Sequence, residues 1–200
     1  MAYTVIAVLL SYLLGSISFS ILIAKWVKGI DIRSYGSGNA GATNTLRVLG
    51  KGPAVFVFLL DIGKGVAAVW IGHWLTTGDW GPVLCGLAAI AGHNWPVYFG
   101  FRGGKGIATT VGAVATLAFV PALIAGVLTI SIIAITRYVS LGSLAFALLT
   151  PIFIWLQHKP MALLWASLVI CVFAFIRHRS NIVKLLNGTE NKLGAKKGRG

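Results

Sequence analysis

Two glycine-rich segments of the chain combine a flexible backbone with cationic and polar side chains. The first reads GSGNAGATN over residues 36–44 and is followed by Arg47. The second covers residues 92–106 and ends in RGGKG, where Lys105 lies between glycines. Glycine lets successive backbone N–H groups converge on an anion, and Arg and Lys supply the positive charge that a phosphate group attracts. Both segments therefore predict phosphate binding.

A third polar segment, RHRSNI at residues 177–182, follows the last apolar stretch of the chain. A cluster of charges that halts membrane insertion would explain the two arginines. It would not require Asn181 close to His178, so this segment is a further candidate for chemistry.

Familiar nucleotide-binding motifs do not explain the first two segments. Gly36, Gly38 and Gly41 have the spacing G-x-G-x-x-G, and Asp61 follows at a distance typical of a dinucleotide site. No strand is expected before these glycines, however, and Asp61 falls within an apolar helix. The chain contains no G-x-x-x-x-G-K-[ST] motif either. We therefore exclude a Rossmann site and a Walker A loop.

The elements that must position these segments are membrane helices. Of the 200 residues, 57% are hydrophobic and only 10% are charged, against about 25% charged residues in a soluble domain. The net charge of +13 would suit nucleic acid in a soluble protein. Here the basic residues lie between apolar stretches, so they indicate membrane topology and anionic ligands instead.

Clear spans are expected at 3–24, 53–77, 82–99, 139–157 and 160–177. The stretch 107–136 contains Pro121 and forms either one kinked span or two short spans that turn at Pro121. With two spans, every Lys and Arg except Lys64 and Lys159 falls in loops on one face. The positive-inside rule favours this arrangement. We expect an all-α bundle of seven transmembrane helices, with the N-terminus outside and the C-terminus cytoplasmic; five spans are the alternative.

The remaining features have simple interpretations. Cys85 and Cys171 lie in apolar stretches and read as small buried hydrophobes. The first span lacks a preceding basic residue and is expected to remain uncleaved. Asp61 and Lys64, three residues apart in the second span, are expected to form a structural ion pair. We predict a membrane domain over residues 1–182 and a basic cytoplasmic tail over 183–200, its last ten or so residues disordered.

Together the three segments resemble the bacterial acyl-phosphate:glycerol-3-phosphate acyltransferase (PlsY) family. The most specific pieces are GSGNAGATNTLR at 36–47 and GHNWPVYFGFRGGKGIAT at 92–109, and LDxxKG appears at 60–65. The resemblance implies transfer of a fatty acyl group from acyl phosphate to the sn-1 hydroxyl of glycerol 3-phosphate. It also implies lysophosphatidic acid and phosphate as products, a cytoplasmic membrane location with the site on its cytoplasmic face, and an early role in phospholipid synthesis.

The resemblance also assigns roles to residues. The expected catalytic set is Ser37, Arg47, Lys105, His178 and Asn181. The expected substrate-binding set is Gly36, Gly38, Asn39, Thr43, Asn44, His93, Gly103, Gly104, Gly106 and Ser143. His93 taken alone would be read as a structural histidine. The family commonly has an acidic residue at the position of Ser180. How strictly the third segment is required in this chain is therefore open.

The identity of the general base stays open at this stage. No His-x₄-Asp motif and no evident Ser-His-Asp set occurs among the four acids and four histidines. We favour direct attack by the substrate hydroxyl, with its proton passing to a substrate phosphate oxygen; His178 is the alternative base. No metal or other cofactor and no nucleic acid is expected. A transporter of phosphate esters is the competing function, disfavoured because no internal repeat is visible.

Overall fold

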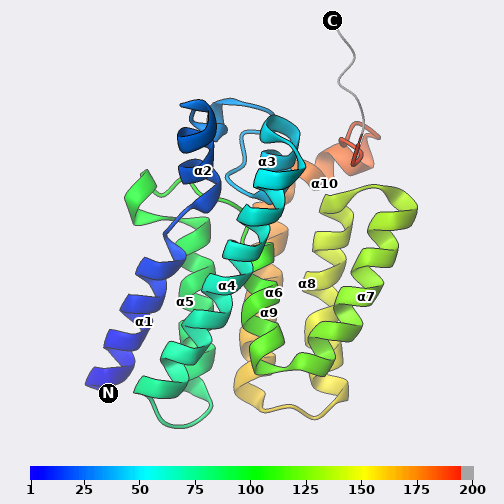
Figure 1. Cartoon of the computed structure of the whole chain (residues 1–200). Helices are drawn as coiled ribbons and strands as arrows, with labels where there is room; N and C mark the ends of the chain where they lie inside the picture. Colours follow the sequence, from blue (N-terminus) through cyan, green and yellow to red (C-terminus); the bar gives the residue numbers. More distant parts are fainter. Residues whose placement is uncertain (195–200) are drawn as a thin grey trace, which may run out of the picture.

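The computed structural model describes residues 1–194 and consists there of helices and loops without strands. Four segments are long and apolar enough to cross a bilayer: α1 and α2 taken together, α4, α7 and α8. A fifth is added if α9 and α10, bent by 62°, count as one span. The N-terminus and the α4–α5, α6–α7 and α8–α9 connections lie at one end of the bundle, and α2, α3 and α10 lie at the other (Figure 1). The ten α-helices of this part of the chain are α1 Ala2–Gly15, α2 Phe19–Lys28, α3 Ala42–Leu49, α4 Lys51–Leu75, α5 Trp80–Asn94, α6 Ile107–Leu117, α7 Phe119–Thr136, α8 Val139–Leu156, α9 Met161–Arg177 and α10 Arg179–Leu186.

The first expected span, 3–24, is broken in the structure. Helix α1 ends at Gly15, and α2 begins at Phe19. The carbonyls of Gly15 and Ile17 in the break accept hydrogen bonds from Lys64 Nζ at 3.0 Å each. An ammonium can satisfy carbonyls that a helix leaves unpaired at its C-terminus. The break therefore depends on a side chain far away in the sequence.

The expected turn at Pro121 is wrong by three residues. The chain turns at Ala118, and Pro121 lies in the first turn of α7. Proline is tolerated there because the first N–H groups of a helix have no intrahelical partner. The separation of 107–136 into two helices is confirmed, with the boundary at Ala118.

Helix α5 is shorter than the expected span 82–99. It ends at Asn94, and the 3₁₀ turn η2 covers Val97–Phe99. Pro96 has no N–H to continue the helix and disfavours helical backbone at Trp95. Residues beyond Asn94 are thereby released to form the second glycine-rich loop.

Glycines set the distance between helices in the core of the bundle. A Cβ at Gly65 of α4 would overlap the backbone of Thr109 in α6, and one at Gly112 of α6 would overlap the backbone of Ile62. Such close backbone approach is the usual way in which membrane helices pack, since lipid provides no hydrophobic drive. Helix α6 is therefore held against α4 and carries the second loop with it.

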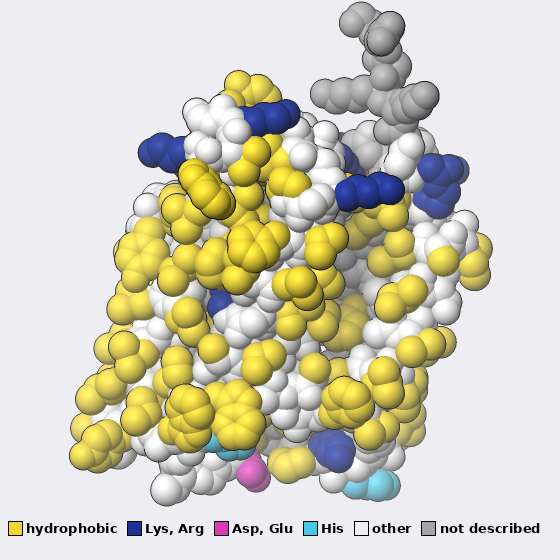
Figure 2. Space-filling model, viewed as in Figure 1, with side chains coloured by type: hydrophobic (Ala, Val, Ile, Leu, Met, Phe, Trp, Pro, Cys, Tyr) yellow, Lys and Arg dark blue, Asp and Glu magenta, His cyan; other side chains and the backbone are white. Residues whose placement is uncertain are grey.

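Large apolar side chains are exposed along the helices, as a bilayer requires. Examples are Leu59 (58% exposed), Ile130 (68%) and Ile135 (83%). On the face seen in Figure 2, apolar side chains cover much of the surface, and most of the visible Lys and Arg lie near the end that carries α2 and α3. This distribution matches the one-sided charge expected from the sequence.

Candidate active site

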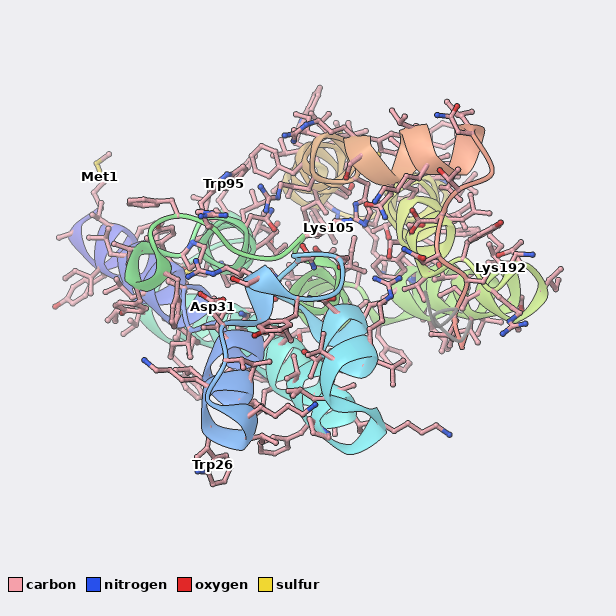
Figure 3. The ribbon with its side chains drawn as sticks, turned by 90° about the horizontal axis from the view of Figure 1, so that it is seen from above. Met1, Trp26, Asp31, Trp95, Lys105 and Lys192 are labelled. Carbon is pink, nitrogen blue, oxygen red and sulfur yellow. The ribbon has the colours of Figure 1, made fainter. Side chains whose placement is uncertain are left out.

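A cavity of about 510 Å³ opens where the three polar segments meet. Seen along the bundle, Lys105 lies centrally between α3 and the α9–α10 corner (Figure 3). Apolar residues of α4, α6, α7 and α8 continue the lining, including Phe58, Val111, Ile130 and Phe146. One part of the cavity is thus polar and cationic, and another is apolar.

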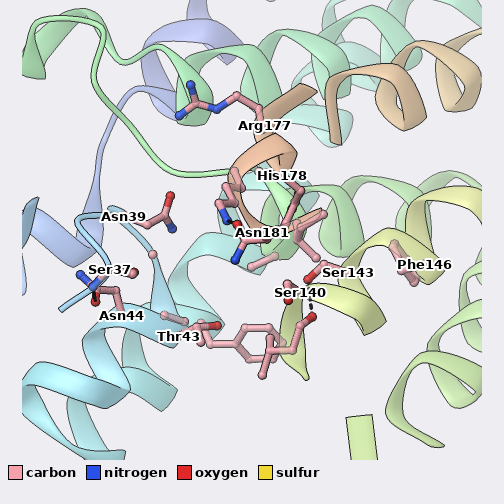
Figure 4. Close-up of a pocket in the computed structure, with 18 of the residues that line it drawn as sticks. Ser37, Asn39, Thr43, Asn44, Ser140, Ser143, Phe146, Arg177, His178 and Asn181 are labelled. Carbon is pink, nitrogen blue, oxygen red and sulfur yellow. Dashed lines mark hydrogen bonds between the residues drawn. The ribbon is translucent and has the colours of Figure 1, made fainter. Parts of the chain in front are cut away.

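Most of the predicted site residues line this cavity. They are Ser37, Gly38, Asn39, Thr43, Asn44, Arg47, His93, Gly103, Lys105, Gly106, Ser143, His178 and Asn181. Figure 4 shows Ser37 and Thr43 on one side, facing Ser143, His178 and Asn181 on the other. Gly36 and Gly104 are not among the residues that line the cavity.

The first loop is shaped from within by Asn44, which is fully buried. Its Oδ1 accepts a hydrogen bond from the backbone N–H of Ser37 at 2.8 Å. Its Nδ2 donates to the carbonyls of Ile32 (3.2 Å) and Tyr35 (3.0 Å). Gly36 has φ +63°, and a Cβ there would overlap Asn44 Oδ1. Asn44 and Gly36 therefore form the loop, leaving Ser37 and Arg47 to face the cavity.

The second loop is fixed by partners on α5 and α9. The N–H of Gly104 donates to the carbonyl of His93 at 3.0 Å. Arg177 donates through Nε (3.1 Å) and a terminal nitrogen (2.7 Å) to the carbonyl of Gly104. These bonds hold Lys105 at the cavity, where its ammonium contacts Asn181 Oδ1. Burial lowers the pKa of Lys105 to about 8, an effect opposed by Glu190 and increased by Arg177, Arg47 and Lys184.

His178 is buried where α9 meets α10. Its Nδ1 lies 2.8 Å from the carbonyl of Ala174. A carbonyl only accepts, so Nδ1 carries the proton and Nε2 is the acceptor of the neutral ring. Burial first, and then the charge of Lys105, lowers the pKa of His178 to about 4, while the bond to Ala174 opposes this shift. At neutral pH the ring is an uncharged hydrogen-bond acceptor.

Sequence reasoning missed Glu190 as a site residue. Its Oε1 accepts hydrogen bonds from Ser140 Oγ (3.0 Å) and Asn181 Nδ2 (2.8 Å), and it lines the cavity. The side chain of Asn181 is thereby oriented with its oxygen toward Lys105. A lone acid in a basic C-terminal segment was the available signal, because Glu190 is the only acid after Asp79.

The C-terminal segment is folded against the bundle as far as it is described. The predicted boundary at 182 falls inside α10, which continues to Leu186. Farther on, the N–H of Leu193 donates to the carbonyl of Arg137 at 2.7 Å, and the Arg137 side chain donates to the carbonyl of Leu193. Residues 195–200, the part of the expected disordered tail with Lys196, Lys197 and Arg199, lie outside the described residues.

Comparison with known proteins identifies the family. The family described as "Glycerol-3-phosphate acyltransferase" matches residues 5–188. Curated glycerol-3-phosphate acyltransferases from Shouchella clausii and Halalkalibacterium halodurans are 58% and 57% identical, the first covering 94% of this chain and 95% of its own, the second 94% of both.

A solved structure has the same fold. It is the crystal structure of PlsY (YgiH), an integral membrane glycerol 3-phosphate acyltransferase, in its glycerol 3-phosphate form. It superimposes with a TM-score of 0.91 at 41% identity, covering 96% of both chains. The resemblance of the three polar segments is confirmed: the chain is an integral membrane acyltransferase and belongs to the glycerol-3-phosphate acyltransferase family.

Proposed function

We propose that the enzyme transfers a fatty acyl group from acyl phosphate to the sn-1 hydroxyl of glycerol 3-phosphate, at the cytoplasmic face of a bacterial membrane. The products are lysophosphatidic acid and inorganic phosphate. The observation that carries this proposal is the double character of the cavity, which is cationic near Lys105 and Arg47 and apolar near Val111 and Ile130. An acyl phosphate has the same two parts.

Related structures agree with these substrates and products. The PlsY structures were determined in a glycerol 3-phosphate form and in a lysophosphatidic acid form. Those ligands correspond to one substrate and one product of the proposed reaction.

The chemistry requires two phosphates to be held side by side. Arg47, Lys105 and the backbone N–H groups of both loops offset their charges. The substrate hydroxyl oxygen attacks the acyl carbonyl carbon, the bond from that carbon to the phosphate oxygen breaks, and phosphate leaves. Because acyl phosphate is a mixed anhydride, positioning and stabilisation of the leaving anion supply most of the catalysis.

The hydroxyl proton passes to a substrate phosphate oxygen in this mechanism. His178 supports the assignment by its depressed pKa of about 4, which makes it a weak base at neutral pH. Its free Nε2 can accept a hydrogen bond from the hydroxyl and orient it. In the proposed roles Ser37, Arg47, Lys105, His178 and Asn181 act directly on the substrates, while Gly38, Asn39, Thr43, Gly103, Gly106 and Ser143 line their phosphates.

We also propose seven membrane crossings with the N-terminus outside. A count of seven requires the short helices α5 and α6, of 15 and 11 residues, to cross the membrane as well. Support comes from their packing beside α4, which at 25 residues is about 37 Å long, and from the one-sided loop charges.

The purified enzyme in lipid nanodiscs, supplied with palmitoyl phosphate and labelled glycerol 3-phosphate, tests the reaction. We expect labelled 1-acyl lysophosphatidic acid and free phosphate in equal amounts, with palmitoyl-CoA failing as a donor. Lys105→Met should abolish product, whereas Lys159→Met, in the α8–α9 connection away from the cavity, is the matched control. Equal turnover with palmitoyl-CoA, or acylation at sn-2, would contradict the proposal.

A further inference from the structure

Three polar side chains are buried together beneath the second loop. Asp61 and Lys64 belong to α4 and His93 to α5, and their side chains are 2%, 1% and 6% exposed. Burying ions in an apolar interior is costly unless they are paired. Lys64 Nζ lies 2.9 Å from Asp61 Oδ1, which confirms the ion pair expected from the sequence. The pair accounts for the charge balance of Asp61 and Lys64, but it does not explain why His93 is buried beside them.

Lys64 makes one contact that an ion pair does not need. Its Nζ lies 2.8 Å from Nδ1 of His93, in addition to the bonds to the carbonyls of Gly15 and Ile17. An ammonium has three donors and no acceptor; the three are used by the carbonyls of Gly15 and Ile17 and by His93, so Asp61 Oδ1 is held by charge alone. Nδ1 of His93 must therefore be the unprotonated, accepting nitrogen.

This contact fixes the tautomer of His93. With Nδ1 accepting, the single proton of the neutral ring is on Nε2. The competing partner is Asp61 Oδ1, which lies 3.5 Å from the same Nδ1 and is too distant for a good hydrogen bond. His93 thus has the opposite tautomer to His178, whose Nε2 accepts.

The protonated nitrogen of His93 faces the phosphate loop. A Cβ at Gly104 would overlap Nε2, so the loop lies directly on this side of the ring. His93 also lines the cavity together with Lys105 and Gly103. An uncharged N–H donor is therefore presented at the edge of the cationic part of the cavity.

We infer that Lys64 is a positioning residue that locks His93 as an Nε2–H donor to a phosphate oxygen of glycerol 3-phosphate. The inference rests on the proposed function for the identity of the ligand. It gives the buried Asp61–Lys64 pair a part in substrate recognition. This is additional to the hydrogen bonds that Lys64 donates to the carbonyls of the α1–α2 break.

The tautomer can be measured without any substrate. In the wild-type enzyme labelled with ¹⁵N-histidine, the unprotonated ring nitrogen resonates far downfield of the protonated one, and His93→Gln identifies the signal by its loss. At pH 7 we expect Nδ1 of His93 to be unprotonated and Nε2 protonated. Protonated Nδ1 in the wild-type enzyme overturns the inference, whatever the activity.

Two variants of His93 test the donor itself. The amide nitrogen of Gln reaches about as far as Nε2, whereas that of Asn reaches only as far as Nδ1. We expect His93→Gln to keep KM for glycerol 3-phosphate within about threefold, and His93→Asn to raise it about tenfold or more at nearly unchanged kcat, as loss of uniform binding does. His158→Gln, an exposed histidine, is the control. Equal KM values for His93→Gln and His93→Asn overturn the inference.

A charge-balanced double variant tests Lys64. Asp61→Leu with Lys64→Met removes both ions, a change that buried ion pairs often tolerate. It also removes the donor to the carbonyls of Gly15 and Ile17, so the folding of the variant is checked before its kinetics. The His93 ring then has no partner that selects the tautomer protonated on Nε2, so we expect NMR signals of both tautomers. We also expect KM for glycerol 3-phosphate to rise about tenfold, with kcat kept within about threefold. A wild-type KM in a folded double variant overturns the inference. If the wild-type enzyme made no lysophosphatidic acid, the proposed function would fail, while the tautomer measurement would still decide the role of Lys64.

Discussion

The ring of His178 donates from Nδ1 to the carbonyl of Ala174 at 2.8 Å, one turn earlier on the same helix. His178 lines the cavity, and this bond leaves Nε2 as the acceptor nitrogen of the ring. With a pKa of about 4, the ring remains neutral from about pH 5 upward. We therefore do not expect His178 to supply an ionisation near pH 6.

The first prediction concerns His178→Gln. Gln still offers an acceptor to the hydroxyl, so we expect kcat to fall by less than about 10²-fold. The acid limb of the pH–rate profile should remain near pH 6, because it follows the second ionisation of a phosphate ester. A profile of the variant that lacks the acid limb would make His178 the base.

Lys105 should determine the alkaline limb. Its pKa of about 8 means that it is protonated below that pH and loses its charge above it. We expect kcat/KM, which reports the free enzyme, to fall as pH rises through about 8. Lys105→Arg should shift this limb to higher pH, since the guanidinium stays charged. An unchanged limb in the Lys105→Arg profile would assign the ionisation to another group.

Arg47→Lys should be damaging although it keeps the charge. Arg presents a planar fork to phosphate, while Lys offers a single ammonium. We expect kcat/KM to fall about tenfold or more, on the order of 1.4 kcal/mol or greater. Steady-state kinetics with both substrates varied would reveal this loss; near-wild-type values would leave Arg47 as a topology charge alone.

Gly104→Ala should impair the enzyme because no space exists for a methyl group. The added Cβ would overlap His93 Nε2 and the carbonyl of Ala40. We expect the second loop to shift and kcat/KM to drop about tenfold or more. Gly63→Ala in α4 is the matched control, since nothing lies within 4 Å of a Cβ there. Equal activities of the two variants would show that the second loop accommodates the methyl group without loss of function.

The topology can be tested with single cysteines in a background where Cys85 and Cys171 are replaced by Ala. Cysteines at Thr77, Phe119 and Lys159 should react with a membrane-impermeant reagent from outside, and a tag after Gly200 should be accessible only from inside. The reason is the charge distribution of the loops. Labelling of the Phe119 position only from the cytoplasm would exclude seven spans.

The sequence by itself determined what depends on residue type and local pattern. Apolar stretches and one-sided charges predicted a helical membrane protein, and glycine beside Lys105 or Arg47 predicted phosphate loops. The membrane prediction is confirmed, because lipid forces helices on any long apolar stretch. Phosphate binding by the two loops stays a prediction, which rests on the few side-chain types that can bind phosphate. Pro96 lies inside the expected span 82–99, and its effect in ending α5 at Asn94 was overlooked.

Only the tertiary structure decided which side chains act on one another. Asn44 lines the cavity, and its amide also holds the first loop together, a role that the sequence did not reveal. Glu190 was overlooked, yet it orients Asn181. Lys64 reaches the α1–α2 break and His93, which are far from it in the chain. Hydrogen-bond partners, helix breaks and histidine tautomers follow from how helices pack, and local sequence contains no record of distances between residues that only packing brings together.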